Sequence, residues 1–161
     1  MNWRIEEKEA FEVFGIERVF KDDETSKVPN FWDELHQNGK YDKLIKDASD
    51  KKGVFGSGVC TINAVCGEHE EGSGIFPYML FAVKTDGSKT DGYKTVTVPK
   101  ATWAVFRAND VKYIGSEISS LFQRAYSEWL PSSGYATIGH GPDLEIYGDG
   151  FEEVWIPVVK K

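Results

Sequence analysis

The spacing of hydrophobic positions changes several times in the first third of the chain, and each change predicts an element. Residues 11–20 are rich in β-branched and aromatic side chains, which predicts a strand. Pro29 then begins a predicted helix over 29–37, since proline is well tolerated in a first helical turn. One face of this helix is apolar, at Val28, Phe31, Trp32 and Leu35. A shorter helical turn is expected over 41–45.

Two strands with a polar turn between them are predicted next. Residues 54–65 are expected to be extended, and residues 76–84 are apolar at successive positions, which indicates a central strand buried on both faces. The turn over 67–74 would join the two as a hairpin. The polar, glycine-containing stretch 86–92 is the most loop-like part of the chain, so it is the expected seam between two halves.

The second half repeats the order of the first. Residues 93–106 are predicted to be extended, and a helix over 114–129 follows, ended by Pro131. The apolar face of this helix carries Ile114, Ile118, Leu121, Phe122, Ala125 and Trp129. Strands over 142–147 and 152–159 then flank a glycine-rich turn, which is a hairpin signal.

The order strand, helix, strand, strand therefore occurs twice, roughly over 10–84 and 93–159. This order predicts an α+β fold of duplicated βαββ units, in which an antiparallel sheet carries helices on one face and a ligand cleft lies between the halves. The 161 residues are one ordinary domain's length. We therefore expect residues 1–161 to form a single domain.

Composition and charge argue against several classes of protein. Lys and Arg number 19 against 26 Asp and Glu, a formal net charge of −7, so direct nucleic-acid binding is not expected. Aromatic residues make up 14% of the chain, which argues against disorder.

No apolar run is long enough to cross a membrane, and the N-terminus lacks the apolar core of a secretion signal, so a cytoplasmic location is expected. The three histidines lack partners at metal-ligand spacing and no cofactor motif is present, so neither a metal nor a cofactor is predicted.

One carboxylate stands out among the predicted strands. Strand alternation places Leu144 and Ile146 on one face, and Glu145 and Tyr147 on the other. If the last two strands pair, Trp155 is expected on the face of Glu145. An outward polar position on a half-exposed sheet is the alternative interpretation. An acid surrounded by aromatic rings, however, is typical of a site for an organic cation, and further apolar walls are expected from Trp103 and Tyr78.

Several segments resemble the GyrI-like, AraC-type effector-binding domain. The strongest are WLPSSGY at 129–135 and DLEIY at 143–147, and the others are FEVFGI at 11–16, VPNFW at 28–32, VP at 98–99, WAVF at 103–106 and WIPV at 155–158. The resemblance runs in order through nearly the whole chain. It implies a duplicated βαββ fold, and a pocket for amphipathic, often cationic, small molecules with one acidic residue, here Glu145.

The resemblance leaves three functions open. Many family members carry a helix-turn-helix domain, for which this chain has no room, so it resembles the stand-alone members. The first hypothesis is a binding, sequestering or regulatory module without catalytic residues, whose cationic aromatic ligand contacts Glu145, Tyr147, Trp155, Trp103 and Tyr78. The second is a hydrolase of reactive polycyclic compounds, with Glu145 as general base. The third is a gyrase-inhibitor-like protein.

Overall fold

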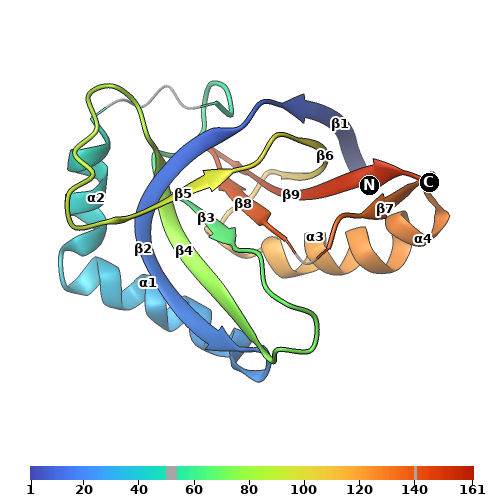
Figure 1. Ribbon diagram of the computed structural model, residues 1–161, viewed down its shortest axis with the longest axis horizontal. Helices are drawn as coiled ribbons and strands as arrows, with labels where there is room; N and C mark the ends of the chain where they lie inside the picture. Colours follow the sequence, from blue (N-terminus) through green and yellow to red (C-terminus); the bar gives the residue numbers. More distant parts are fainter. Residues whose placement is uncertain (50–53, 140) are drawn as a thin grey trace.

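The computed structural model describes residues 1–49, 54–139 and 141–161. Within these residues, nine strands form one antiparallel sheet, in the order β1-β6-β9-β8-β3-β4-β2-β5, with β7 paired to β9 (Figure 1). The strands are β1 (Asn2–Lys8), β2 (Phe11–Lys21), β3 (Asn63–Cys66), β4 (Ile75–Val83), β5 (Lys94–Val98), β6 (Ala101–Asn109), β7 (Tyr135–Thr137), β8 (Asp143–Tyr147) and β9 (Phe151–Lys160). The predicted α+β fold is confirmed.

The helices fall into two groups, one from each half of the chain. The first comprises the 3-10 helix η1 (Asp22–Lys27), α1 (Val28–Gln37) and α2 (Lys40–Ala48). The second is continuous, with α3 (Ile118–Arg124), the π-helical turn η2 (Ala125–Trp129) and α4 (Leu130–Ser132). None of the helices in the described part of the chain is long and apolar enough to cross a membrane.

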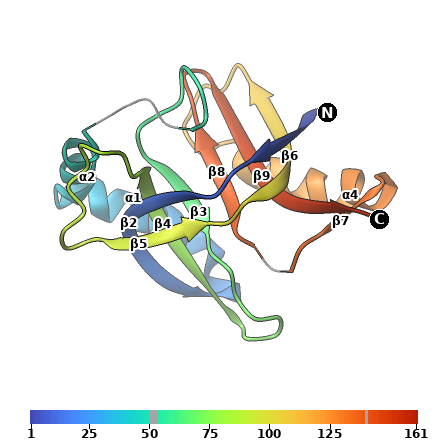
Figure 2. The same cartoon turned by 45° about the horizontal axis from the view of Figure 1, so that its top comes forward.

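The sheet has two matching halves that meet where β3 pairs with β8. Strands β3, β4 and β2 of the first half mirror β8, β9 and β6 of the second. The strand that precedes each half in the sequence pairs with the other half. Strand β1 comes before the first half and pairs with β6 of the second, and β5 comes before the second half and pairs with β2 of the first. Only residues 9–10 connect β1 at one end of the sheet to β2 near the other end. Such a short connection reaches about 10 Å, so the sheet must curl round on itself, as Figure 2 shows.

The curled sheet is covered on both faces. On the outer face α1, α2 and the continuous helix α3–η2–α4 pack against one apolar core, which includes Phe31, Leu44 and Trp129. A second apolar core fills the inside of the curl and includes Phe81, Trp103 and Trp155. Because β4 contributes to both cores, its sequence is apolar at successive positions rather than alternating.

Two predicted elements had the wrong bounds, and two strands were missed. The strand expected over 54–65 is reduced to β3, because Gly56 and Gly58 have φ angles of 93° and 79°, which a strand does not accommodate. The helical turn expected over 41–45 is a full helix, α2, whose buried Leu44 and Ala48 join the outer core. Strands β1 and β7 were not predicted, because β1 is largely polar with no buried residue and β7 has only 3 residues.

The second predicted helix is also displaced toward the C-terminus. Ile114, expected on its buried face, is 81% exposed, and α3 begins four residues later. Gly115 has a φ of 85°, which interrupts the helical backbone at this point. The helix also continues past Pro131 to Ser132, after the wider turn η2. In place of a helical turn, residues 114–117 form a loop at the edge of the site.

Candidate functional site

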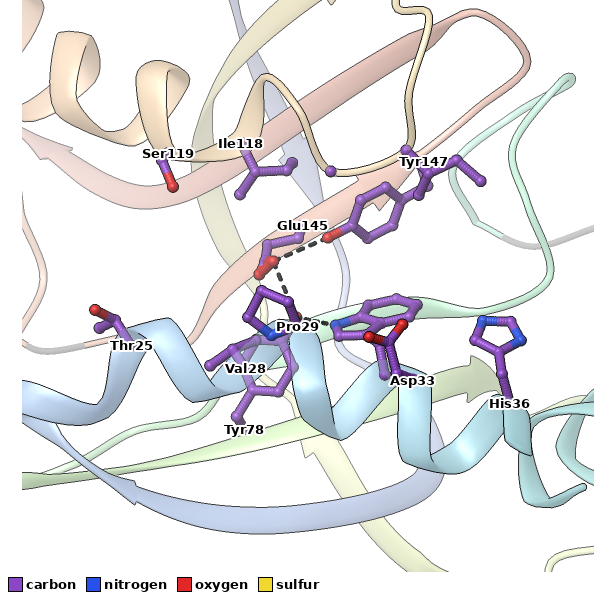
Figure 3. A pocket seen from close by; sticks show the side chains of 13 residues that line it. Thr25, Val28, Pro29, Asp33, His36, Tyr78, Ile118, Ser119, Glu145 and Tyr147 are labelled. Atoms are coloured by element: carbon purple, nitrogen blue, oxygen red, sulfur yellow. Dashed lines mark hydrogen bonds between the residues drawn. The ribbon is translucent and has the colours of Figure 1, made fainter. Parts of the chain in front are cut away.

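A cavity of about 400 Å³ opens between α1 and α3 on the outer face of the sheet. Both halves of the chain supply its walls (Figure 3), and the lining residues are Thr25, Val28, Pro29, Trp32, Asp33, His36, Tyr78, Ile114, Gly115, Ile118, Ser119, Glu145 and Tyr147. The expected cleft between the halves is therefore present.

Glu145 lies at the base of this cavity, near the centre of the sheet. On β8 it faces Ala64 of β3 on one side and Val154 of β9 on the other. Tyr147 lies two residues further along β8 and shares its face, as strand alternation predicts. Glu145 is only 7% exposed, so an acidic side chain is held within the layer between sheet and helices.

The carboxylate of Glu145 is the acceptor for two phenols. Oε1 accepts hydrogen bonds from the hydroxyl of Tyr147 at 2.9 Å and from the hydroxyl of Tyr78 at 3.0 Å. The indole Nε1 of Trp32 donates in turn to the Tyr78 hydroxyl at 2.9 Å. Both phenols donate to the same oxygen, and no described residue donates to Oε2. One oxygen of the carboxylate is thus held in place, and the other has no hydrogen-bond donor among the described residues.

The electrostatics of the site favour a cation. Burial raises the pKa of Glu145 to about 7, against the lowering effect of the two phenol hydrogen bonds, and the nearby carboxylates of Glu152 and Asp143 raise it further. Burial and the adjacent Glu145 charge also raise the pKa values of Tyr78 and Tyr147, so both phenols stay protonated as donors. Among the described residues that line the cavity, none is Lys or Arg. The negative charge of an ionised Glu145 is therefore not neutralised by the protein.

Aromatic and aliphatic side chains form the walls around this charge. The ring of Trp32 meets that of Tyr147 edge to face, with centroids 5.3 Å apart. Val28, Pro29 and Ile118 add aliphatic surface from α1 and α3. The arrangement combines one buried acid with flat apolar surfaces, which suits a molecule that is both aromatic and positively charged.

The edge of the cavity near residues 114–117 is anchored by a second buried acid. The carboxylate of Glu152 accepts hydrogen bonds from the backbone N–H of Gly115 and, at 3.0 Å, from that of Glu117. Glu152 shares the outer face of the sheet with Tyr147, which it faces across β8 and β9. It therefore positions the loop that carries Ile114 and leads into α3.

The structure brings together Glu145, Tyr147 and Tyr78, but places the other two expected site residues elsewhere. Trp155 pairs with Leu144, so its side chain is on the opposite face from Glu145, and the predicted shared face was wrong. The hairpin turn pairs Tyr147 with Glu152, and this pairing sets the register between β8 and β9. Alternation within each strand does not determine that register. Trp103 and Trp155 are both fully buried in the inner core, with ring centroids 6.0 Å apart, and neither lines the cavity.

Several lining residues were not identified from the sequence. Trp32 was assigned to the apolar face of its helix, and that face turns out to border the cavity as well as the outer core. No pattern in the sequence separates Trp32 from the other tryptophans, since Trp103 and Trp155 also bury an indole N–H, without an acceptor among the described residues. Asp33 and His36 lie on the exposed side of α1, where no local pattern distinguishes a site residue from an ordinary surface residue.

Comparison with known proteins identifies the family. The family described as integron-associated effector binding protein, Cass2, matches residues 4–158. The chain therefore belongs to this effector-binding family, which is GyrI-like, as the sequence motifs predicted. No curated protein sequence matches the chain.

Solved structures share the fold at low sequence identity. SAV2435 bound to tetraphenylphosphonium superposes with a TM-score of 0.73 at 16% identity, over 99% of this chain and 94% of that one. A putative transcription regulation protein from Staphylococcus aureus MU50 has a TM-score of 0.69 at 16% identity, covering 98% of each chain. An integron cassette protein from the mobile metagenome of Vibrio cholerae has a TM-score of 0.67 at 16% identity, covering 98% and 95%. All three confirm the duplicated fold.

Proposed function

We propose that this protein binds amphipathic aromatic cations in the cavity between α1 and α3, with Glu145 as the charge partner. The observation that carries the proposal is the buried carboxylate of Glu145, whose Oε2 has no donor among the described residues and whose surroundings contain no lining Lys or Arg. A cation placed against Oε2 would compensate a charge that is otherwise costly to bury.

The walls of the cavity account for the rest of the expected affinity. A ring that packs against Trp32, Tyr147 and Ile118 removes apolar surface from water, and each cation–aromatic contact contributes about 0.5–2 kcal/mol. A volume of about 400 Å³ is in the range of pockets for drug-sized ligands. Stacking and one charge discriminate little between planar cations, so we expect broad specificity.

The comparisons support the same ligand class. The family is described as effector-binding. The structural neighbour SAV2435 was solved with tetraphenylphosphonium, which is a lipophilic aromatic cation. A cytoplasmic location and the absence of direct nucleic-acid binding remain predictions from composition.

Calorimetry with tetraphenylphosphonium tests the proposal. Glu145→Gln keeps the shape of the side chain and an oxygen for both phenols but removes the charge, and we expect its affinity to fall by about 1.5–3 kcal/mol, the scale of a charged hydrogen bond. Glu34→Gln is the matched control, because it removes one charge from an exposed ion pair with Arg18. Triphenylphosphine oxide, a neutral aromatic compound, should bind both variants alike. Equal affinity of wild type and Glu145→Gln for the cation would contradict the proposal.

One observation also favours a catalytic role for the same residue. A carboxylate with a pKa of about 7 and one open oxygen can accept a proton from water near neutral pH, as a general base does. In that case Glu145→Gln would retain ligand binding and lose turnover of a reactive polycyclic compound. Product accumulation in the wild type would therefore separate the hydrolase from the binding module. The gyrase-inhibitor hypothesis rests on the resemblance alone.

A further inference from the structure

We infer that the cavity selects dications, with Glu145 as the partner of one positive charge and Asp33 at the mouth as the partner of a second. This inference rests on the proposed function, because it assumes that Glu145 binds a cation. It adds a specificity-determining residue on α1 and a narrower ligand class, an aromatic or alkyl spacer with a positive charge at each end.

Two carboxylates line the cavity, and they lie at different depths. Glu145 extends from β8 at the base and is buried, whereas Asp33 lies on α1 and is exposed to solvent. Figure 3 shows both on the walls of the same cavity, which they enter from the sheet and from the helix respectively. An elongated ligand that fills the cavity from base to mouth would therefore meet an acid at each end.

Asp33 differs from the acid next to it on the same helix. Glu34 forms an ion pair with Arg18 of β2, outside the cavity. Within the described residues, Asp33 makes no ion pair and no side-chain hydrogen bond, and the cavity lining supplies no Lys or Arg to neutralise it. Helix α1 thus directs one paired acid away from the cavity and one unpaired acid toward it.

Aromatic surface connects the two acids. Trp32, which precedes Asp33 in the sequence, is half-buried and donates to Tyr78, and Tyr78 donates to Glu145. A ligand between the two carboxylates would therefore contact the indole of Trp32 and the phenol of Tyr78. The order acid, aromatic ring, acid matches a ligand with the order cation, apolar spacer, cation.

The contribution of Asp33 is expected to be modest. An ion pair at an exposed position is screened by solvent and salt, so a second charge should improve binding roughly two- to fivefold at low ionic strength. The measurement belongs at about pH 8.5, above the pKa of about 7 of Glu145, so that the carboxylate at the base of the cavity is ionised.

The test compares bis-pyridinium alkanes of increasing linker length with mono-pyridinium alkanes of equal length. Calorimetry at low salt measures each pair on wild type, Asp33→Asn, Glu34→Gln and Glu145→Gln. We expect wild type and Glu34→Gln to bind the best-fitting dication roughly two- to fivefold more tightly than its monocation. Asp33→Asn should lose this preference and keep the monocation affinity.

The outcomes separate this inference from the proposed function. If Asp33→Asn and Glu34→Gln reduce the dication preference equally, the effect comes from net charge and the inference is wrong. The inference also fails if no linker length gives wild type a preference for the dication. Loss of monocation binding in Glu145→Gln would still support the proposed function in both cases. If wild type binds neither ligand, the proposed function itself is contradicted.

Discussion

The hydroxyl of Tyr78 donates to the carboxylate of Glu145 over 3.0 Å, although 67 positions separate the two residues in the chain. Their strands, β4 and β8, are not neighbours, because β3 lies between them. Ala64 of β3 faces Glu145 and shares the outer face of the sheet with both residues. Its small side chain leaves the space in which a phenol from one half of the protein can reach an acid from the other.

The first prediction concerns stability and pH. The pKa of Glu145 is about 7 in the folded protein and near its ordinary value of 4.5 in the unfolded chain, so the fold favours the protonated acid. This contribution to stability is fully present below about pH 4.5 and is lost as the pH rises to about 7. Glu145→Gln should therefore raise the free energy of unfolding at pH 8 by up to about 3 kcal/mol, with little change at pH 4.

Urea titrations of wild type and Glu145→Gln at both pH values check this prediction. Glu34→Gln serves as the control, since it replaces an acid of an exposed ion pair and should alter stability by less than about 1 kcal/mol. A variant that is no more stable than wild type at pH 8 would show that the buried charge is compensated in the folded state.

The second prediction concerns ligand binding and pH. A cation binds the ionised form of Glu145, so below pH 7 each bound cation should displace up to one proton, and affinity should fall about tenfold per pH unit. Glu145→Gln should remove this dependence. Calorimetry of tetraphenylphosphonium binding in buffers of different ionisation enthalpy counts the protons released. Proton release that persists in Glu145→Gln would assign the proton to another group and contradict the prediction.

The third prediction concerns the two phenols. Each of them donates to the ionised carboxylate and so lowers the pKa of Glu145. Tyr78→Phe or Tyr147→Phe removes one donor, and the pH midpoint of cation binding should move upward by about one unit. Tyr93→Phe is the matched control, because the Tyr93 hydroxyl donates to the carboxylate of Asp47, outside the cavity lining. The same calorimetric pH series measures all three variants, and an unchanged midpoint in both phenol variants would contradict the prediction.

The fourth prediction concerns the outer core. Trp129 is 8% exposed, and its ring packs against Trp3, Phe106 and Tyr135, with centroids 5.1–5.7 Å apart. Trp129→Ala should lower the free energy of unfolding by about 3–5 kcal/mol, the usual range for truncation of a buried tryptophan. Trp3→Ala, at a residue that is 45% exposed, should have a much smaller effect. Urea titration compares the two, and similar losses would show that Trp129 is not a central core residue.

Features that depend on local spacing were predictable. The helix α1 and the strands β2, β4, β8 and β9 were each predicted from the apolar residues within their own segment. The common face of Glu145 and Tyr147 follows in the same way, because alternation along one strand does not depend on its partners. The aromatic setting of Glu145 was likewise visible in the sequence, since Tyr147 is close to it in the chain.

Features that depend on how elements meet were not predictable. Trp155 was assigned to the wrong face because its side relative to Glu145 depends on the register between β8 and β9, and a shift of one residue reverses it. No pattern in the sequence marks Asp33 as a site residue, because its place at the cavity depends on how α1 packs on the sheet.

By itself, the sequence determined the α+β class and the order of most of its helices and strands, and it singled out Glu145 as a candidate, because these depend on residues near one another in the chain. Only the tertiary structure decided that β1 pairs with the second half of the sheet, that the sheet curls around Trp103 and Trp155, and that Tyr78 meets Glu145. These contacts join residues far apart in the sequence, and their geometry is set by strand register and by the packing of helices on the sheet, which no local pattern records.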